Sequence, residues 1–298
     1  MTKSGYRSVS TRMKDALRPM SFIVNLKRAL VPNSDGMLGI TKLNLLRTFP
    51  LFRPYSAGTY KDRSRLTVQA INQVFPFLAE LAHTVGHKPL PIQPITSVVK
   101  TESQRSSVAS LKSLFDKHGS DKADQLDYHY LYAPILEDSA NIRRIFEIGM
   151  GTNNTDVVSN MGHEGSPGAS LRAFRDFCPE AIIHGADVDK RILFQEDRIK
   201  THFIDQTDPA TFERLLTELP RDFDLFIDDG LHSPNANIAS LDFGLKLVKV
   251  GGWAVVEDIG SSAIPLWQSV AAMMPESHRP YLFVAKSGSI VFAVQRLH

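Results

Sequence analysis

From about residue 144 the chain alternates short apolar runs with amphipathic stretches, and this order constrains the fold more than any other feature. The apolar runs are RRIFEIG, AIIHGADVD, IKTHFID, FDLFIDDG and WAVVEDI, and the stretches between them include GASLRAFRDFCPEA, PATFERLLTEL and NIASLDFGLKLVKV. Strands that alternate with helices predict right-handed crossovers and a mostly parallel sheet. The last two runs, RPYLFVAKSG and SIVFAVQRL, meet at a Ser-Gly turn and predict a hairpin with one antiparallel strand. The sequence therefore predicts an α/β fold.

The first hundred residues follow a different pattern. The spacing of apolar residues predicts helices over Ser10–Leu30 and Leu66–Val85, and the prolines between Lys88 and Pro94 predict an extended linker. We therefore divide the chain into a mostly helical appendage, residues 1–100, and a globular domain, residues 101–298. The appendage is interpreted as an oligomerisation element or as a wall of a substrate pocket.

Charge and composition exclude several classes of protein. The 34 Lys and Arg residues nearly balance 32 acids, so the net charge of +2 gives no general argument for nucleic-acid binding. Residues 1–70 hold thirteen basic and three acidic residues, but these are interspersed with apolar ones, which favours packing over nucleic-acid or membrane binding. The chain has one cysteine, Cys178, and lacks an apolar run of about 18 residues, so we expect a cytoplasmic protein without membrane insertion.

A glycine turn follows the first strand of the globular domain. It runs Glu147-Ile-Gly149-Met-Gly151, and two close glycines let the backbone turn sharply and approach a ligand. The dinucleotide pattern G-x-G-x-x-G is not completed, because the third glycine position is Asn154. This departure argues against a nicotinamide enzyme. An ordinary strand-to-helix turn remains the alternative.

Acids end the next two strands. Asp187 is placed to accept hydrogen bonds from ribose hydroxyls, and Asp205-Gln206 is placed to reach a purine edge. Together with the glycine turn they predict a groove for a nucleoside without a diphosphate, which suits S-adenosylmethionine better than NAD. Solvated loop acids are the alternative.

Carboxylates and a histidine collect at the ends of the last two parallel strands. One strand ends in Asp228-Asp229 with His232 three residues on, and the other ends in Glu257-Asp258. Close carboxylates repel, and a divalent cation relieves the repulsion; oxygen ligands favour Mg²⁺, with Mn²⁺ also possible. The imidazole of a histidine suits a general base near neutrality, so His232 is the candidate base. Strand-end caps or ion pairs are the alternative. The donor-rich segment KHGSDK (117–122) is predicted as a loop, with a plain surface loop as the alternative to a functional one.

These motifs resemble a known family. The segments KHGSDK, FEIGMGT, GASLRAFRDFCPEAIIHGADVD, FIDQTD, FDLFIDDGLH and GGWAVVEDI, within residues 106–298, resemble class I S-adenosylmethionine-dependent methyltransferases. The specific likeness is to Mg-dependent sugar O-methyltransferases of macrolide biosynthesis, the mycinamicin and macrocin enzymes, and to cephalosporin-hydroxylase-like relatives. The resemblance implies a Rossmann-like methyltransferase sheet.

The resemblance also implies roles for individual residues. It assigns Mg²⁺ to Asp229, Glu257 and Asp258, and the general base to His232. The expected cofactor contacts, to which we add Thr152 and Asp228 from the same strand ends, are Glu147, Gly149, Gly151, Thr152, Asp187, Asp205, Gln206 and Asp228.

The prediction for function is therefore an S-adenosylmethionine- and Mg²⁺-dependent O-methyltransferase, acting on a hydroxyl of a sugar or glycosylated natural product. The partners expected are a small-molecule or sugar acceptor and a second copy of the chain, and no nucleic acid. Three alternatives stay open: a metal-dependent methyltransferase for another small molecule, a polysaccharide or a glycolipid; a hydroxylase-like relative; and a non-catalytic protein that binds the cofactor.

Overall fold

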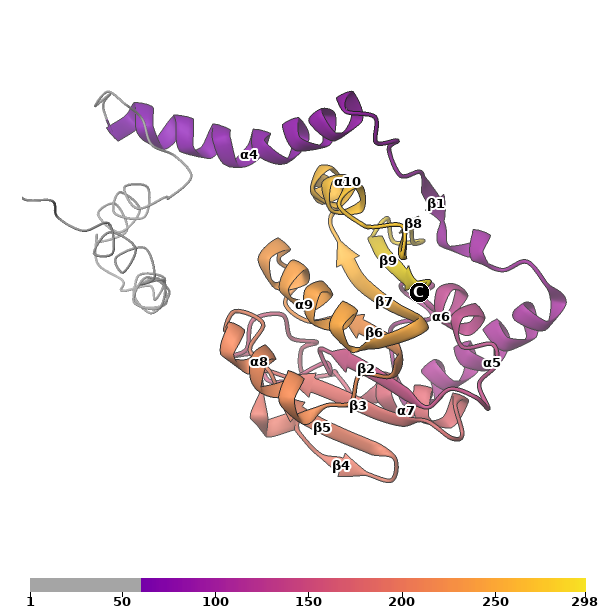
Figure 1. Ribbon diagram of the computed structural model, residues 1–298. Helices are drawn as coiled ribbons and strands as arrows, with labels where there is room; N and C mark the ends of the chain where they lie inside the picture. The colour runs from indigo at the N-terminus through magenta and orange to yellow at the C-terminus, as the bar shows by residue number, and fades with distance from the viewer. Residues whose placement is uncertain (1–59) are drawn as a thin grey trace, which may run out of the picture. The chain divides into compact units, whose positions relative to one another are not determined.

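The computed structural model describes residues 60–298 (Figure 1). Contacts divide the chain into two units, residues 1–76 and 77–298, and each is described by itself. Helix α4, Tyr60–Thr84, confirms the helix predicted over Leu66–Val85. The helix predicted over Ser10–Leu30 lies outside the described residues.

The second unit is built on a nine-stranded sheet. Its order is β1-β8-β9-β7-β6-β2-β3-β5-β4. The bounds are β1 Ile92–Pro94, β2 Arg144–Ile148, β3 Ile182–Asp187, β4 Gln195–Glu196, β5 Ile199–Phe203, β6 Phe223–Asp228, β7 Val248–Ile259, β8 His278–Val284 and β9 Ile290–Arg296. Strand β9 runs antiparallel to both neighbours, as the predicted hairpin requires, and the short β4 is also antiparallel to β5. The α/β prediction is confirmed.

Helices cover both faces of this sheet. In Figure 1, α5, α6 and α7 lie on one face, and α8, α9 and α10 lie on the other. The bounds are α5 Glu102–His118, α6 His129–Ile135, α7 Ala169–Phe177, α8 Pro209–Glu218, α9 Pro234–Leu247 and α10 Ile264–Ala272, with short 3-10 turns at η2 Ile95–Val98, η3 Lys190–Ile192 and η4 Ser261–Ala263.

Local signals in the sequence set the ends of these helices. Thr101 and Gln104 form a capping box at the start of α5, and Gly119 ends this helix in the left-handed conformation, at φ 77°. Asp208 caps α8 by accepting a hydrogen bond from its first turn, and Pro209 occupies the first helical position.

The prediction of a linker over Lys88–Pro94 is wrong for its last residues. Ile92–Pro94 forms β1 and pairs with β8 at the edge of the sheet. The backbone of Leu90 also exchanges two hydrogen bonds with the side chain of Gln268. The segment therefore joins the sheet.

Alternate residues of the central strands face opposite layers of the core. Ile145, Ile183 and Leu225 are fully buried in one cluster with Phe115 of α5 and Phe174 of α7. This layer places α5 and α7 against the sheet and holds the chain between α5 and β2 close to the strand ends.

The opposite layer is aromatic and includes two histidines. Phe146 stacks on Phe226 and meets Phe243 of α9 edge to face. The rings of His184 and His202 stack beside Phe146, and Nδ1 of His184 lies 3.0 Å from Nε2 of His202. Burial lowers the pKa of both histidines, that of His184 to about 3.

This histidine pair predicts a loss of stability in acid. Between pH 6.5 and about 3 the unfolded chain binds a proton at His184 that the folded protein does not bind, so stability falls as the pH falls. Relative to the variant His184→Phe/His202→Phe, we expect the wild type to lose about 1.4 kcal/mol per pH unit from His184 and a further amount from His202. Denaturant unfolding at pH 6, 5 and 4 measures this difference, because contributions from all other groups cancel. Free energies of unfolding that change equally with pH in the two proteins would contradict this prediction.

Candidate active site

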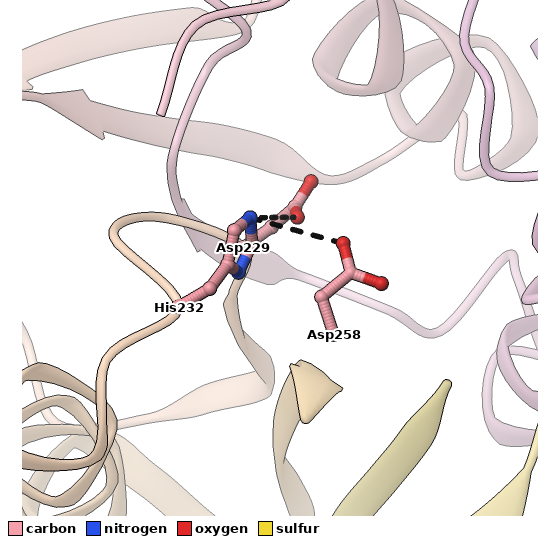
Figure 2. Close-up of side chains that lie close together, drawn as sticks. All are labelled: Asp229, His232 and Asp258. Carbon is pink, nitrogen blue, oxygen red and sulfur yellow. Dashed lines mark ion pairs between the residues drawn. The ribbon is translucent and has the colours of Figure 1, made fainter. Parts of the chain in front are cut away.

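Two carboxylates and a histidine meet at the carboxyl-end edge of the sheet. Asp229 directly follows β6, His232 stands on the turn into α9, and Asp258 lies near the end of β7 (Figure 2). Nε2 of His232 lies 3.8 Å from Oδ1 of Asp229 and 3.8 Å from Oδ2 of Asp258. One ligand atom from each residue lies within 4.8 Å of the others, and each side chain is about a quarter to a third exposed. The site is therefore open to a ligand.

The backbone at this cluster is unusual. His232 and Asp258 have φ of 54° and 53°, in the left-handed region that non-glycine residues seldom adopt. The pairing of β7 with β9 also shifts between Val256 and Ile259, around Asp258. Such conformations cost free energy and collect at functional sites, where the fold imposes them. Here the left-handed turn and the shifted register set where each side chain points.

Glu257, predicted as a third metal ligand, lies apart from the cluster. It is fully buried, and its two carboxylate oxygens accept hydrogen bonds from Lys122 and from the hydroxyl of Tyr132. Adjacent residues of a strand point to opposite sides, which separates Glu257 from Asp258. The structure thus brings together Asp229 and Asp258 of the three predicted ligands, with His232 beside them.

Lys122 is the residue that the sequence did not reveal. It belongs to the segment predicted as a loop, and it is 1% exposed, with Nζ 2.6 Å from Oδ2 of Asp229. Burial by itself would lower the pKa of Lys122, but the carboxylates of Asp229, Glu257 and Glu147 together raise it well above its usual range. The loop prediction is confirmed for Lys122, and the alternative of a plain surface loop is wrong for this residue, because its partners lie on strands far along the chain.

The glycine turn packs directly against the cluster. Gly149 has a φ of 89°, and a Cβ there would lie 1.9 Å from the carbonyl oxygen of Asp229. Gly151 has a φ of 75°, with Met161 close by. Only glycine fits at residue 149, and the turn therefore meets the loop that carries the predicted metal ligand.

The acid at the end of β3 holds this turn. Oδ2 of Asp187 accepts a hydrogen bond from the backbone N–H of Met150 at 2.9 Å, and Oδ1 accepts one from Asp189 at 2.8 Å. Burial raises the pKa of Asp187 despite these hydrogen bonds. Thr152 donates to Asp189 at 2.7 Å, so Thr152 and Asp187 both help to fix the predicted cofactor loop. Their contact with a cofactor stays a prediction.

Glu147, at the base of the turn, is fully buried. Its oxygens face Lys122 at 3.2 Å and the hydroxyl of Ser170 at 2.7 Å. Burial raises the pKa of Glu147 to about 7, although Lys122 and Ser170 act in the opposite direction. Glu147 is therefore joined to the site through Lys122.

Gln206 and Asp228 support the loop that carries Asp229 and His232. Oε1 of Gln206 accepts from the backbone of Leu231, and Nε2 donates to Asp228, both at 2.7 Å. Burial raises the pKa of Asp228 to about 6, while hydrogen bonds from Asn237 and Gln206 oppose this effect. Both side chains are thus engaged within the protein, and their predicted cofactor contacts remain predictions.

Asp205 makes a local turn. It accepts hydrogen bonds from the backbone and the hydroxyl of Thr207, at 2.9 and 2.6 Å, ahead of α8. The loop before α7 contacts the loop that follows β6, since the hydroxyl of Ser159 donates to the carbonyl oxygen of Gly230 at 2.8 Å.

Together, the strand order and the glycine turn define the class I methyltransferase fold. A solved structure of the MycE methyltransferase from the mycinamycin biosynthetic pathway, in complex with Mg, SAH and mycinamycin VI, aligns with a TM-score of 0.50 and 24% identity. The alignment covers 63% of this chain and 54% of that one.

Within that class, the relatives are sugar O-methyltransferases. The 8-demethyl-8-alpha-L-rhamnosyl tetracenomycin-C 2'-O-methyltransferase of Streptomyces olivaceus is 27% identical over 60% of this chain and 46% of its own length. The mycinamicin VI 2''-O-methyltransferase of Micromonospora griseorubida is 32% identical over 41% of this chain and 28% of its own length. These similarities confirm the resemblance seen in the sequence. The chain spans less than half the length of these curated relatives, and no family model matches it.

Proposed function

We propose that this chain is an S-adenosylmethionine- and Mg²⁺-dependent O-methyltransferase that acts on a sugar hydroxyl of a glycosylated natural product. The observation that carries the proposal is the cluster of Asp229, His232 and Asp258 directly beside the glycine turn at Gly149. Relatives named for methylating rhamnosyl and macrolide sugars support the acceptor class.

The residues present fit a divalent cation. Asp229 and Asp258 offer carboxylate oxygens that lie close enough together to face one ion, and the imidazole of His232 lies beside them. Two carboxylates suit Mg²⁺ or Mn²⁺. When bound there, the ion would lower the pKa of a coordinated acceptor hydroxyl.

The protein's own groups supply the rest of the chemistry. His232 takes the proton from the acceptor hydroxyl at Nε2, and the two flanking carboxylates stabilise the imidazolium that forms. The glycine turn and Asp187 would hold the methyl donor beside the acceptor, and the donor would supply its sulfonium methyl group to the acceptor oxygen. In this proposal the protein accelerates methyl transfer mainly by positioning the two reactants, and His232 adds one proton transfer.

The proposal predicts that activity depends on a divalent cation. Transfer of a labelled methyl group from S-adenosylmethionine to a panel of rhamnosylated aglycones measures turnover. EDTA is expected to lower it about 100-fold or more, because a coordinated cation stabilises the alkoxide by several kcal/mol. Mg²⁺ or Mn²⁺ is expected to restore it, and Asp258→Asn to resist restoration. Full turnover in EDTA would contradict the metal role, and binding of S-adenosylhomocysteine without transfer would favour a non-catalytic protein.

The N-terminal region is proposed to affect binding of the acceptor rather than binding of the cofactor. We propose that it contributes to assembly of a homo-oligomer or to the acceptor pocket of a cytoplasmic enzyme. No helix among residues 60–298 is long and apolar enough to cross a lipid bilayer.

Deletion of residues 1–76, the first unit, tests this assignment. We expect the affinity for S-adenosylhomocysteine to stay within about twofold, because the glycine turn and the strand ends lie in the second unit. Acceptor KM or the assembly state is expected to change. Calorimetry, light scattering and steady-state kinetics measure the three quantities. A truncated protein that matches the full chain in all three would contradict the assignment.

A further inference from the structure

The segment after the glycine turn folds back against that turn. It comprises residues 152–161, and we call it the strap. The backbone N–H of Met161 donates to the carbonyl oxygen of Thr152 at 2.8 Å, so the strap returns to its own start. The side chain of Met161 lies 3.3 Å from the Cβ that a larger residue would add at Gly151. The strap therefore lies against the turn where the cofactor is predicted to bind.

On one side the strap is tied to the turn that follows β3. Arg191 forks onto two carboxylates: it donates to Asp189 at 2.7 and 3.0 Å, and to Asp156 of the strap at 2.9 and 3.2 Å. Thr152 and Asn154 also donate to Asp189, both at 2.7 Å. These donors, Arg191 above all, hold the pKa of Asp189 well below its usual range, so it stays ionised. Forked arginine–carboxylate pairs that join into a network are stronger and more directional than single surface ion pairs.

On the other side a single hydrogen bond holds the strap. The hydroxyl of Ser159 donates to the carbonyl oxygen of Gly230 at 2.8 Å, in the loop between Asp229 and His232. This hydrogen bond is exposed, and Ser159 has a φ of 61°, which costs free energy for a residue other than glycine. An exposed neutral hydrogen bond contributes little net free energy, because water replaces it when it opens. The Ser159 end is therefore the weaker attachment.

The order of the strands makes these two attachments span the predicted cofactor groove. Strand β2 lies between β3 and β6 and pairs with both in parallel. Arg191 follows β3 and Gly230 follows β6, so the strap crosses the carboxyl end of β2, where the glycine turn lies. A ligand that enters or leaves at this turn requires one attachment to open.

We propose that Arg191 is a positioning residue that anchors the strap, and that the hydrogen bond from Ser159 to Gly230 is the gate that opens to admit and release S-adenosylmethionine. This assignment rests on the proposed cofactor site at the glycine turn. Because Arg191 orders the strap before the cofactor binds, less conformational entropy is lost when the groove closes around it.

Equilibrium binding of S-adenosylhomocysteine to the full chain, measured by calorimetry, tests the anchor. Arg191→Met is expected to raise Kd about 10-fold, because the strap must then be ordered at the moment of binding. Raising KCl from about 0.05 M to about 1 M is expected to raise the wild-type Kd about 3-fold, since salt screens the half-exposed ion pairs of Arg191, and to leave the Kd of Arg191→Met unchanged. Arg144→Met is the control, since it breaks an ion pair with Asp222 at the start of β2, and it is expected to bind as wild type does. A wild-type Kd in Arg191→Met would overturn the anchor.

The association and dissociation rates of S-adenosylhomocysteine, measured by stopped flow, test the gate. Ser159→Ala is expected to raise both rates about 3- to 10-fold, the equivalent of one net hydrogen bond. Its Kd is expected to stay within about twofold, because the strap opens more often in the free and the bound protein alike. Ser269→Ala is the control, since it removes a serine-to-carbonyl hydrogen bond within α10, and it is expected to keep wild-type rates. Unchanged rates in Ser159→Ala, or a rise in the dissociation rate alone, would overturn the gate.

Hydrogen exchange of the cofactor-free protein distinguishes failure of this assignment from failure of the proposed function. The backbone N–H groups of residues 152–161 are expected to exchange about 10-fold faster in Arg191→Met than in the wild type, while those of β2 and β3 keep wild-type rates. Equal exchange in the strap of both proteins would overturn the anchor even if Kd had changed. A wild type that does not bind S-adenosylhomocysteine would instead count against the proposed function, while the exchange rates still decide whether Arg191 holds the strap.

Discussion

Replacing His232 by asparagine is expected to lower turnover by roughly 10²–10⁴-fold, the usual contribution of a general base. Asparagine has no basic nitrogen at neutral pH, and it adopts the left-handed conformation more readily than most residues, which suits the φ of 54° at this position. The affinity for S-adenosylhomocysteine is expected to stay within about twofold, because the glycine turn is untouched. Single-turnover methyl transfer and calorimetry measure the two quantities.

The same variant distinguishes a role of His232 as general base from a role as metal ligand. If His232 acts as the base, the rise in Tm on adding Mg²⁺ persists in His232→Asn, whereas a ligand role predicts that this rise is largely lost. His87→Asn, the same change at an exposed histidine outside the cluster, is the control and is expected to behave as wild type. Unchanged turnover in His232→Asn would refute the assignment of the base.

Replacing Gly149 by alanine is expected to abolish cofactor binding, with at least a 100-fold loss of affinity for S-adenosylhomocysteine, a free-energy change of about 3 kcal/mol. A Cβ at this position would lie 1.9 Å from the carbonyl oxygen of Asp229, and neither of the two backbones can yield without moving the other. The clash therefore displaces the predicted cofactor turn and the metal-bearing loop together. Calorimetry with S-adenosylhomocysteine and denaturant unfolding measure the two consequences.

Gly251→Ala provides a matched control. Gly251 has a φ of 83°, close to the 89° of Gly149, but nothing lies within 4 Å of the Cβ that alanine would add. It is expected to cost only the strain of a left-handed alanine, about 1–2 kcal/mol of stability, and to leave cofactor affinity unchanged. Equal effects of the two substitutions would show that the close contact between Gly149 and Asp229 does not determine cofactor affinity or stability.

Much of this site could be predicted from the order of residues alone. Asp229 and His232 follow β6, and Asp258 lies near the end of β7, which runs parallel to β6. The carboxyl ends of parallel strands reach the same edge of a sheet. The α/β pattern, the terminal hairpin and the helix caps are likewise local, because each depends on residues only a few positions apart. For these features, short-range periodicity and chain direction carry enough information.

The positions of Lys122 and Glu257 depended on the tertiary structure. Lys122 meets Asp229 and Glu257 across 107 and 135 residues of chain, and no local pattern distinguishes a lysine buried among carboxylates from one in a solvated loop. Glu257 and Asp258 are neighbours in sequence, but the strand turns them to different sides, and a shifted register with a left-handed residue places Asp258 near His232. The sequence by itself thus determined the fold class and the edge of the sheet that carries the site. Only the packing of distant segments decided which carboxylates are neutralised and which remain open, because burial and charge pairing are properties of the folded chain.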